Sequence, residues 1–94
     1  ASAARALIRL GAHVAVVGGK RKDILRISLR ANGDFHKKTG IHLGRDIAKP
    51  LGEYLKGMGG GHSTSAGVNG AGDVDAGFKR CIELLRKHLA KNAD

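Results

Sequence analysis

The sequence is poor in cysteine, proline and aromatic residues. Its 94 residues include one Cys, one Pro, one Tyr, two Phe and no Trp. A single cysteine excludes an internal disulfide framework, which small secreted domains usually need. The chain has no apolar run of the ~18 residues that a membrane span requires, and no charged segment followed by an apolar leader. We therefore expect a cytoplasmic protein that neither spans a membrane nor folds as a secreted scaffold.

Acidic residues are also scarce, which leaves the chain strongly basic. Lys and Arg number 17 against 8 Asp and Glu, for a formal net charge of +9. The excess is concentrated in residues 20–56, where 10 basic and 4 acidic residues leave a net +6. This balance favours an anionic partner such as nucleic acid, and an ordinary solvated surface is the alternative. The few aromatic side chains argue against a sheet that stacks bases on rings, as many RNA-binding modules do.

Length and composition predict one folded domain. Hydrophobic residues make up 41% of the chain, as in ordinary globular proteins. Residues 1–10 are rich in helix formers and carry a short apolar stripe, so we interpret them as the end of a linker helix from a longer parent chain. The domain itself is then residues 11–94.

Two consecutive segments predict an antiparallel β-hairpin. Residues 13–17 are a short, β-branched apolar run, which is typical of a strand buried on both faces. Residues 24–31 alternate between apolar and polar side chains, which predicts a half-exposed strand. The intervening residues 18–23 are expected to form the turn.

The following segments predict helices around one more strand. Residues 32–42 show no periodicity, so we expect a basic loop there, whereas residues 44–57 place apolar side chains at helical spacing. Pro50 interrupts this stretch and predicts two short helices that meet near Lys49. Residues 63–68 suit a short strand.

A final helix is predicted after Asp73 or Asp75, either of which can cap it. Phe78 lies in its apolar stripe, and the neighbouring Cys81 is expected to be a small buried hydrophobe. Tyr54, in the preceding helical stretch, is also assigned to the core. Together these elements predict an α/β fold: a small mixed β-sheet with an antiparallel hairpin, covered by helices.

The first candidate site is a run of three glycines followed by a histidine: Gly59, Gly60, Gly61 and His62. Consecutive glycines allow successive backbone N–H groups to converge on an anion and form a nest. Hydroxyl side chains follow at residues 63–65. The alternative is a plain turn after a helix, whose C-terminal dipole is unfavourable to an anion.

The second candidate site is the polar side of the predicted strand, with Arg26, Ser28 and Arg30. Alternation points all three to one side, where guanidinium groups can hold phosphate through paired hydrogen bonds. A solvated strand face is again the alternative. The histidines and Cys81 show no metal-ligand spacing and the carboxylates are scattered, so we predict no metal site and no two-carboxylate acid–base chemistry.

The Gly-Gly-Gly-His run at 59–62, the Ala-Gly pair at 66–67 and the Ser-Leu-Arg segment at 28–30 together resemble the DHH-associated domain. This is the C-terminal substrate-binding domain of DHH-family phosphoesterases. The resemblance covers nearly the whole chain, from residue 14 through the final helix. Within the family the chain is most similar to archaeal RecJ-like exonucleases, whose versions carry a segment like Gly-Ile-His-Leu-Gly at 40–44.

The resemblance implies a division of labour. In such enzymes a separate N-terminal domain with an Asp-His-His motif binds manganese and cleaves phosphodiester bonds. The associated domain holds single-stranded DNA, RNA or a short oligonucleotide beside it, so no cofactor and no activity are expected from this chain alone. By the resemblance, His62 and the backbone of the glycine run contact the phosphate nearest the scissile bond, and Arg30 contacts a neighbouring phosphate.

Other readings stay open from the sequence. The related C-terminal domain of alanyl-tRNA synthetase would bind folded tRNA, but the histidine after the glycine run argues against it. A protein-interaction module that joins replication proteins after losing its ligand is a second alternative, and the presence of both Arg30 and His62 argues against that loss. A dinucleotide or cyclic dinucleotide is a third ligand, but the additional basic residues favour a longer strand.

Overall fold

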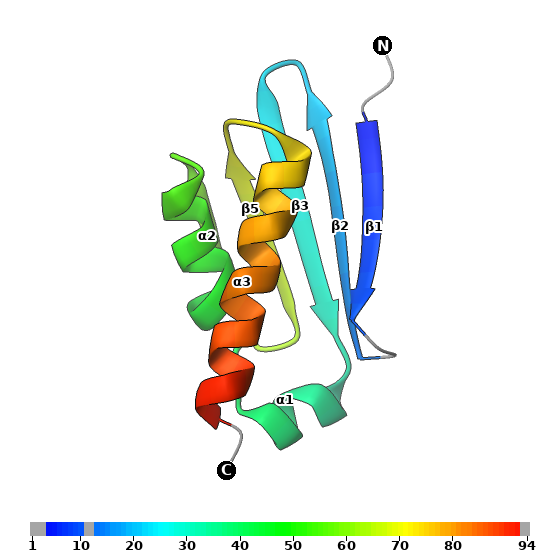
Figure 1. Ribbon diagram of the computed structural model, residues 1–94, viewed down its shortest axis with the longest axis vertical. Helices are drawn as coiled ribbons and strands as arrows, with labels where there is room; N and C mark the ends of the chain where they lie inside the picture. Colours follow the sequence, from blue (N-terminus) through cyan, green and yellow to red (C-terminus); the bar gives the residue numbers. More distant parts are fainter. Residues whose placement is uncertain (1–3, 11–12, 93–94) are drawn as a thin grey trace.

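The computed structural model describes residues 4–10 and 13–92. Within them, five strands form one sheet in the order β1 (Ala4–Leu10), β2 (Val14–Arg21), β3 (Ile24–Ala31), β5 (Ser65–Gly70) and β4 (Met58–Gly61) (Figure 1). The helical elements are α1 (Gly33–Thr39), the π-helical turn η1 (Leu43–Ala48), α2 (Lys49–Tyr54) and α3 (Val74–Asn92). Among these residues no helix is both long and apolar enough to cross a membrane.

The α/β fold class is confirmed, with helices packed on a sheet that contains the expected hairpin. β2 and β3 pair antiparallel, and Arg21 lies opposite Ile24, so that Lys22 and Asp23 alone make the turn. In the described residues, every pair of neighbouring strands is antiparallel. The sheet is therefore not mixed as predicted, because the chain returns through the β4–β5 hairpin and places β5 antiparallel to β3.

Residues 4–10 form the edge strand β1, so the prediction of a linker helix was wrong. The segment pairs with β2 along its whole length, from Ala4 opposite Lys20 to Leu10 opposite Val14. Differences in helix propensity between residues are small, and a complete ladder of backbone hydrogen bonds to a neighbouring strand overrides them. The sheet thus extends into the segment assigned to a linker. Residues 1–3 and Gly11 lie outside the described residues.

The segment expected to be a basic loop contains the helix α1. The side chain of Asn32 accepts a hydrogen bond from the N–H of Phe35 at 2.9 Å, which caps the first turn. Gly40 ends the helix with φ of 72° and donates its N–H to the carbonyl of His36 at 2.8 Å. Phe35 is buried, so this short helix is anchored in the core.

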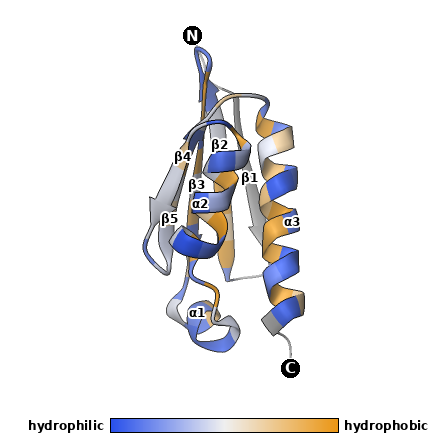
Figure 2. Ribbon diagram, turned by 90° about the vertical axis from the view of Figure 1, so that its left-hand side faces the viewer, coloured by the Kyte–Doolittle hydropathy of each residue, from blue (hydrophilic) through white to orange (hydrophobic). Residues whose placement is uncertain are grey.

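The core lies between the sheet and the helices. Leu25, Ile27 and Leu29 of β3 are fully buried, as their alternation predicted. Figure 2 shows the matching amphipathic pattern on α3, where hydrophobic and hydrophilic residues alternate along the helix. Phe78 and Cys81 are buried in this interface, which confirms both assignments.

Tyr54 does not join the core, and its assignment was wrong. Its side chain is 55% exposed and its ring stacks under the guanidinium of Arg80, with 5.0 Å between the guanidinium carbon and the ring centroid. The predicted junction of two short helices near Lys49 is confirmed, because η1 ends at Ala48 and α2 begins at Lys49 with Pro50 in its first turn. Ala48 and Lys49 both keep right-handed helical φ and ψ, so one element continues into the other without a break. Leu51 is a buried side chain on α2.

Candidate nucleic-acid interface

One face of the sheet is open in the described part of the chain. Figure 2 shows the sheet nearly in profile, with α3 along one side of it. On β3 the polar residues Arg26, Ser28 and Arg30 are exposed while the residues between them are buried. Val17 of β2 is 42% exposed, so β2 is not buried on both faces as its composition predicted. The open face is therefore a continuous surface across several strands.

Strand register arranges this surface into three rows that cross β3, β5 and the β4 end of the sheet. The rows are Arg30, Ser65 and His62; Ser28, Gly67 and Gly60; and Arg26, Asn69 and Met58. We call these positions the three-row surface. None of them is acidic, and the ion pairs found among the described side chains, Arg45–Asp46 and Arg80–Glu83, lie elsewhere. Both arginines of the surface thus have their full charge available to a ligand.

The first row brings two of the predicted site residues together. Arg30 lies opposite Ser65, and the N–H of His62 donates to the carbonyl of Ser65 at 2.8 Å. Neighbouring strands are about 4.8 Å apart, so the Cα atoms of Arg30 and His62 are separated by roughly 10 Å. An extended arginine side chain spans most of that distance, and one phosphodiester group placed over Ser65 is within reach of both residues.

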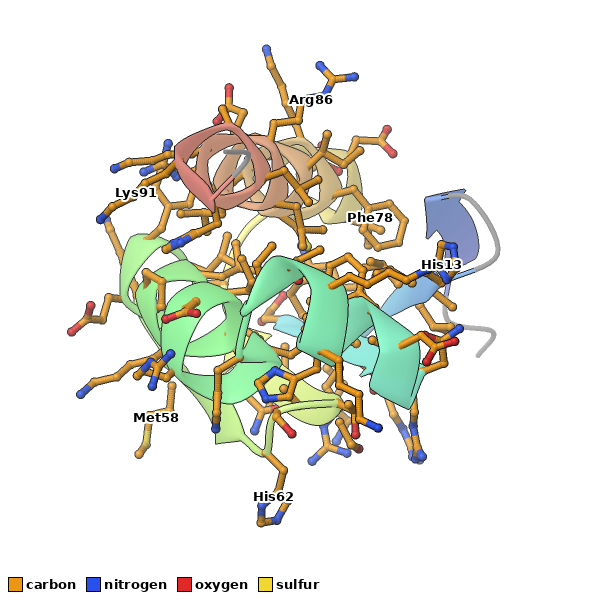
Figure 3. All side chains as sticks on the ribbon, turned by 90° about the horizontal axis from the view of Figure 1, so that it is seen from below. His13, Met58, His62, Phe78, Arg86 and Lys91 are labelled. Atoms are coloured by element: carbon orange, nitrogen blue, oxygen red, sulfur yellow. The ribbon has the colours of Figure 1, made fainter. Side chains whose placement is uncertain are left out.

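Hydrogen bonds hold the backbone of the loop that carries His62, although the imidazole of His62 is exposed. Backbone hydrogen bonds connect it to two other elements: Ala31 N–H to the Thr64 carbonyl at 2.9 Å, and Gly44 N–H to the His62 carbonyl at 3.0 Å. Figure 3 shows the imidazole of His62 projecting outward from the end of the hairpin. The first turn of η1 therefore uses its free N–H groups on this loop and not on an anion.

The glycine run is an edge strand and not a nest, so the predicted convergence of its N–H groups was wrong. Gly59, Gly60 and Gly61 all lie in β4 and pair with β5. Because the N–H of His62 points toward β5, antiparallel geometry points the N–H of Gly60 the same way and those of Gly59 and Gly61 the opposite way. Three amides in this arrangement cannot bind one anion together.

Close packing explains why glycine is needed at Gly59 of β4 and at Gly44 of η1. A side chain on Gly59 would collide with the carbonyl oxygen of Ala48, and one on Gly44 would collide with the carbonyl of Gly61. η1 thus packs directly on the backbone of β4. In contrast, a side chain on Gly60 would meet nothing within 4 Å, because that position faces the open side.

The third row contains Asn69, a residue that the sequence analysis did not identify as part of a site. Nε of Arg26 donates a hydrogen bond to Oδ1 of Asn69 on β5 at 3.0 Å. The bond holds the guanidinium over the sheet and leaves its two terminal nitrogens free of any hydrogen bond among the described residues. Alternation along residues 65–70 places Ser65, Gly67 and Asn69 on one side, and that signal was available in the sequence.

The segment before η1 carries a second unpredicted cluster. The Nδ1 atom of His42 accepts the N–H of Arg45 at 2.9 Å, and a carboxylate oxygen of Asp46 accepts the N–H of His42 at 2.9 Å. This reciprocal pair caps η1 in the manner of a capping box. The Arg45 guanidinium, 2.9 Å from Asp46, holds the pKa of that carboxyl below its ordinary value. The cluster fixes the helical turn that supports the His62 loop.

The described residues contain no group of three or more His, Cys, Asp or Glu side chains placed to hold a metal ion. Two of the histidines, His36 and His42, lie near each other with ring centroids 6.4 Å apart. Their Nδ1 atoms are already engaged with the backbone at Ile41 and Arg45.

Comparison with known proteins gives a relative but no family. No protein-family model matches the chain. The chain is 34% identical over 83 residues to an uncharacterized protein of the archaeon Methanocaldococcus jannaschii. The alignment covers 88% of this chain and 25% of that protein. The chain therefore spans about a quarter of the length of this relative.

Proposed function

We propose that this chain is the substrate-binding domain of a DHH-family phosphoesterase similar to RecJ-like exonucleases, and that it holds single-stranded DNA or RNA on the three-row surface. The observation that carries the proposal is the first row, where Arg30 and His62 share the three-row surface, whose described positions include no acidic residue. Two cationic or hydrogen-bonding groups on either side of a serine suit a phosphodiester.

The proposed binding works through side chains and not through the glycine backbone. Arg30 offers a planar pair of N–H donors to two phosphate oxygens, and Ser28 and Ser65 present hydroxyl groups beside it. His62 donates from the far side of the same row. Gly60 leaves the sheet surface bare at that point, which allows the sugar–phosphate backbone to approach closely.

Cleavage belongs, in this proposal, to a separate domain of the whole protein. The relative is about four times as long as the aligned region, which leaves room for a manganese-dependent catalytic domain in the same chain. This chain then supplies binding and orientation, and the catalytic domain in cis is its main partner. Replication proteins are further partners that the proposal allows, and the cytoplasm is the expected compartment.

A nucleic-acid strand held by its phosphates fits the three-row surface better than a ligand whose bases are recognised one by one. The three-row surface contains no aromatic side chain other than the His62 imidazole on which a base would stack, and its polar groups suit phosphates. Binding should therefore depend on salt and length and hardly on sequence. A preference for folded tRNA would favour the alternative related to alanyl-tRNA synthetase.

The proposal is tested by fluorescence anisotropy of labelled single-stranded DNA and RNA at two salt concentrations. We expect Arg30→Ala and His62→Ala each to weaken binding, with the salt slope of Arg30→Ala falling by roughly 0.7 for the lost phosphate contact. Arg86→Ala is the matched control, because it removes the same charge from the exposed side of α3. Equal losses in all three variants would show diffuse attraction, and no binding at low salt would refute the proposal.

A second arm concerns activity. The chain incubated with manganese and a labelled strand should release no product, because the proposal assigns bond cleavage to another domain. A hydrolytic signal that survived stringent purification and disappeared in Arg30→Ala would overturn the division of labour.

A further inference from the structure

We propose that Arg26 and Asn69 form a second phosphate-binding position, two phosphate steps away from the row of Arg30 and His62. The preferred ligand is then a strand of three or more nucleotides and not a dinucleotide. This inference rests on the proposed function, since it extends the same surface, and it names the ligand length that the surface selects.

The geometry of Arg26 carries the proposal. Its Nε–H bond to Oδ1 of Asn69, 3.0 Å long, restricts the side chain and leaves the two terminal nitrogens without a hydrogen bond among the described residues. No carboxylate among the described side chains pairs with Arg26. A guanidinium that is oriented but unneutralised loses little conformational entropy when it binds a phosphate. The amide nitrogen of Asn69 stands beside it as a further donor.

The spacing along β3 sets the length of the ligand. Arg26 and Arg30 are four residues apart on one face of a strand, which separates their Cα atoms by about 13–14 Å. One extended nucleotide spans about half of this distance. A strand that runs alongside β3 therefore meets Arg30 and Arg26 with alternate phosphates, and the phosphate between them lies over Ser28.

The middle row leaves the path between the two positions open. Gly60 has nothing within 4 Å of where a side chain would begin, and the nearest atom to that point on Gly67 is the carbonyl oxygen of Ile27 at 3.9 Å. Ser28 presents only a hydroxyl group there. No side chain longer than serine lies between the flanking rows on β3, β5 and β4, so a sugar–phosphate backbone can lie flat on the sheet.

A competition experiment tests the proposal. Oligothymidylates with a 5′-phosphate displace a labelled strand, and their length varies from dinucleotide to dodecanucleotide. We expect affinity to rise between the dinucleotide and the trinucleotide or tetranucleotide. Arg26→Ala should lower the affinity for the longer ligands about tenfold, which is the effect of one lost charge-assisted contact. It should change the affinity for the dinucleotide by less than about twofold. Arg30→Ala should lower the affinity for oligonucleotides of every length.

Asn69 provides an independent variant. Asn69→Asp retains an acceptor for Nε of Arg26 but neutralises the charge of the Arg26 guanidinium. The variant should therefore abolish the increase of affinity with ligand length, while its stability in urea unfolding stays unchanged. Arg86→Ala controls for net charge. If affinity is independent of length, or if Arg26→Ala lowers the affinity for all lengths equally, the second phosphate-binding position is refuted while the first row stands. If no oligonucleotide binds, the proposed function falls as well.

Discussion

The carbonyl oxygen of Ala48 lies where the first side-chain atom of a larger residue at Gly59 would have to be. This contact makes the glycine run a packing surface, since η1 rests on the backbone of β4. It also separates the glycines into one type that faces the helices and one, at Gly60, that faces the open side.

Gly59→Ala should destabilise the protein by ~1–3 kcal/mol, because the added methyl group forces η1 away from the sheet. Gly60→Ala should change the free energy of unfolding by no more than about 0.5 kcal/mol, because its position is open and its φ is not positive. Urea unfolding of both variants measures the difference. Equal destabilisation would contradict the assignment of these two glycines to opposite faces.

Gly18 makes room for the ring of Phe78 in the same way. A Cβ at position 18 would stand 2.6 Å from Cε1 of that ring, so Gly18→Ala should cost ~1–3 kcal/mol. Phe78→Leu removes the ring that the new methyl group would meet. The double variant should therefore lose less stability than the sum of the two single losses, with a difference of at least about 0.5 kcal/mol. Gly67→Ala combined with Phe78→Leu is the control, for which additivity is expected.

The cap of η1 predicts a loss of stability in acid. The Arg45 guanidinium holds the pKa of Asp46 below its ordinary value of 3.8, so the unfolded chain takes up this proton first as the pH falls. The contribution of Asp46 to stability is therefore present above pH 3.8 and is lost as the pH falls through the lower, native pKa. Chemical unfolding measured between neutral and acidic pH tests this.

Asp46→Ala should lose about 1 kcal/mol at neutral pH, the usual cost of a missing cap. Its stability should also fall less steeply in acid than that of the parent chain. Glu53→Gln removes a carboxylate that is exposed and makes no hydrogen bond or ion pair within the described residues, and it should retain the parent profile. Identical acid profiles for the parent chain and Asp46→Ala would be the contrary result.

Burial protects the thiol of Cys81. Loss of hydration raises its pKa to about 12, so the native protein holds no reactive thiolate at mildly alkaline pH. Alkylation by iodoacetamide should proceed only through unfolding, and the destabilised Gly59→Ala variant should react faster, as mass spectrometry can show. In the unfolded chain the thiol ionises near pH 9, so this group lowers stability as the pH rises from 9 toward 12. Labelling as fast in buffer as in urea would contradict the buried position.

Periodicity identified the parts of the molecule in which local pattern and burial agree. The alternation is clearest on β3, where Ile27 is buried and Arg26 is exposed. Pro50 marked the junction of two short helices because it has no N–H to donate, and the π-helical turn η1 gives way to α2 directly before it. Asn32 and Gly40, which cap α1, are residue types typical of helix ends, so they indicate a helix within the segment that lacks periodicity.

The sequence by itself determined the amphipathic elements, the excess of positive charge and the shared side of Arg26, Ser28 and Arg30, because each depends on residue spacing within one segment. Only the tertiary structure decided that residues 4–10 pair as a strand and that the glycine run packs under η1. It alone also placed His62 in the row of Arg30. These outcomes depend on contacts between segments distant in the chain, and such contacts leave no periodic signal in the segments themselves.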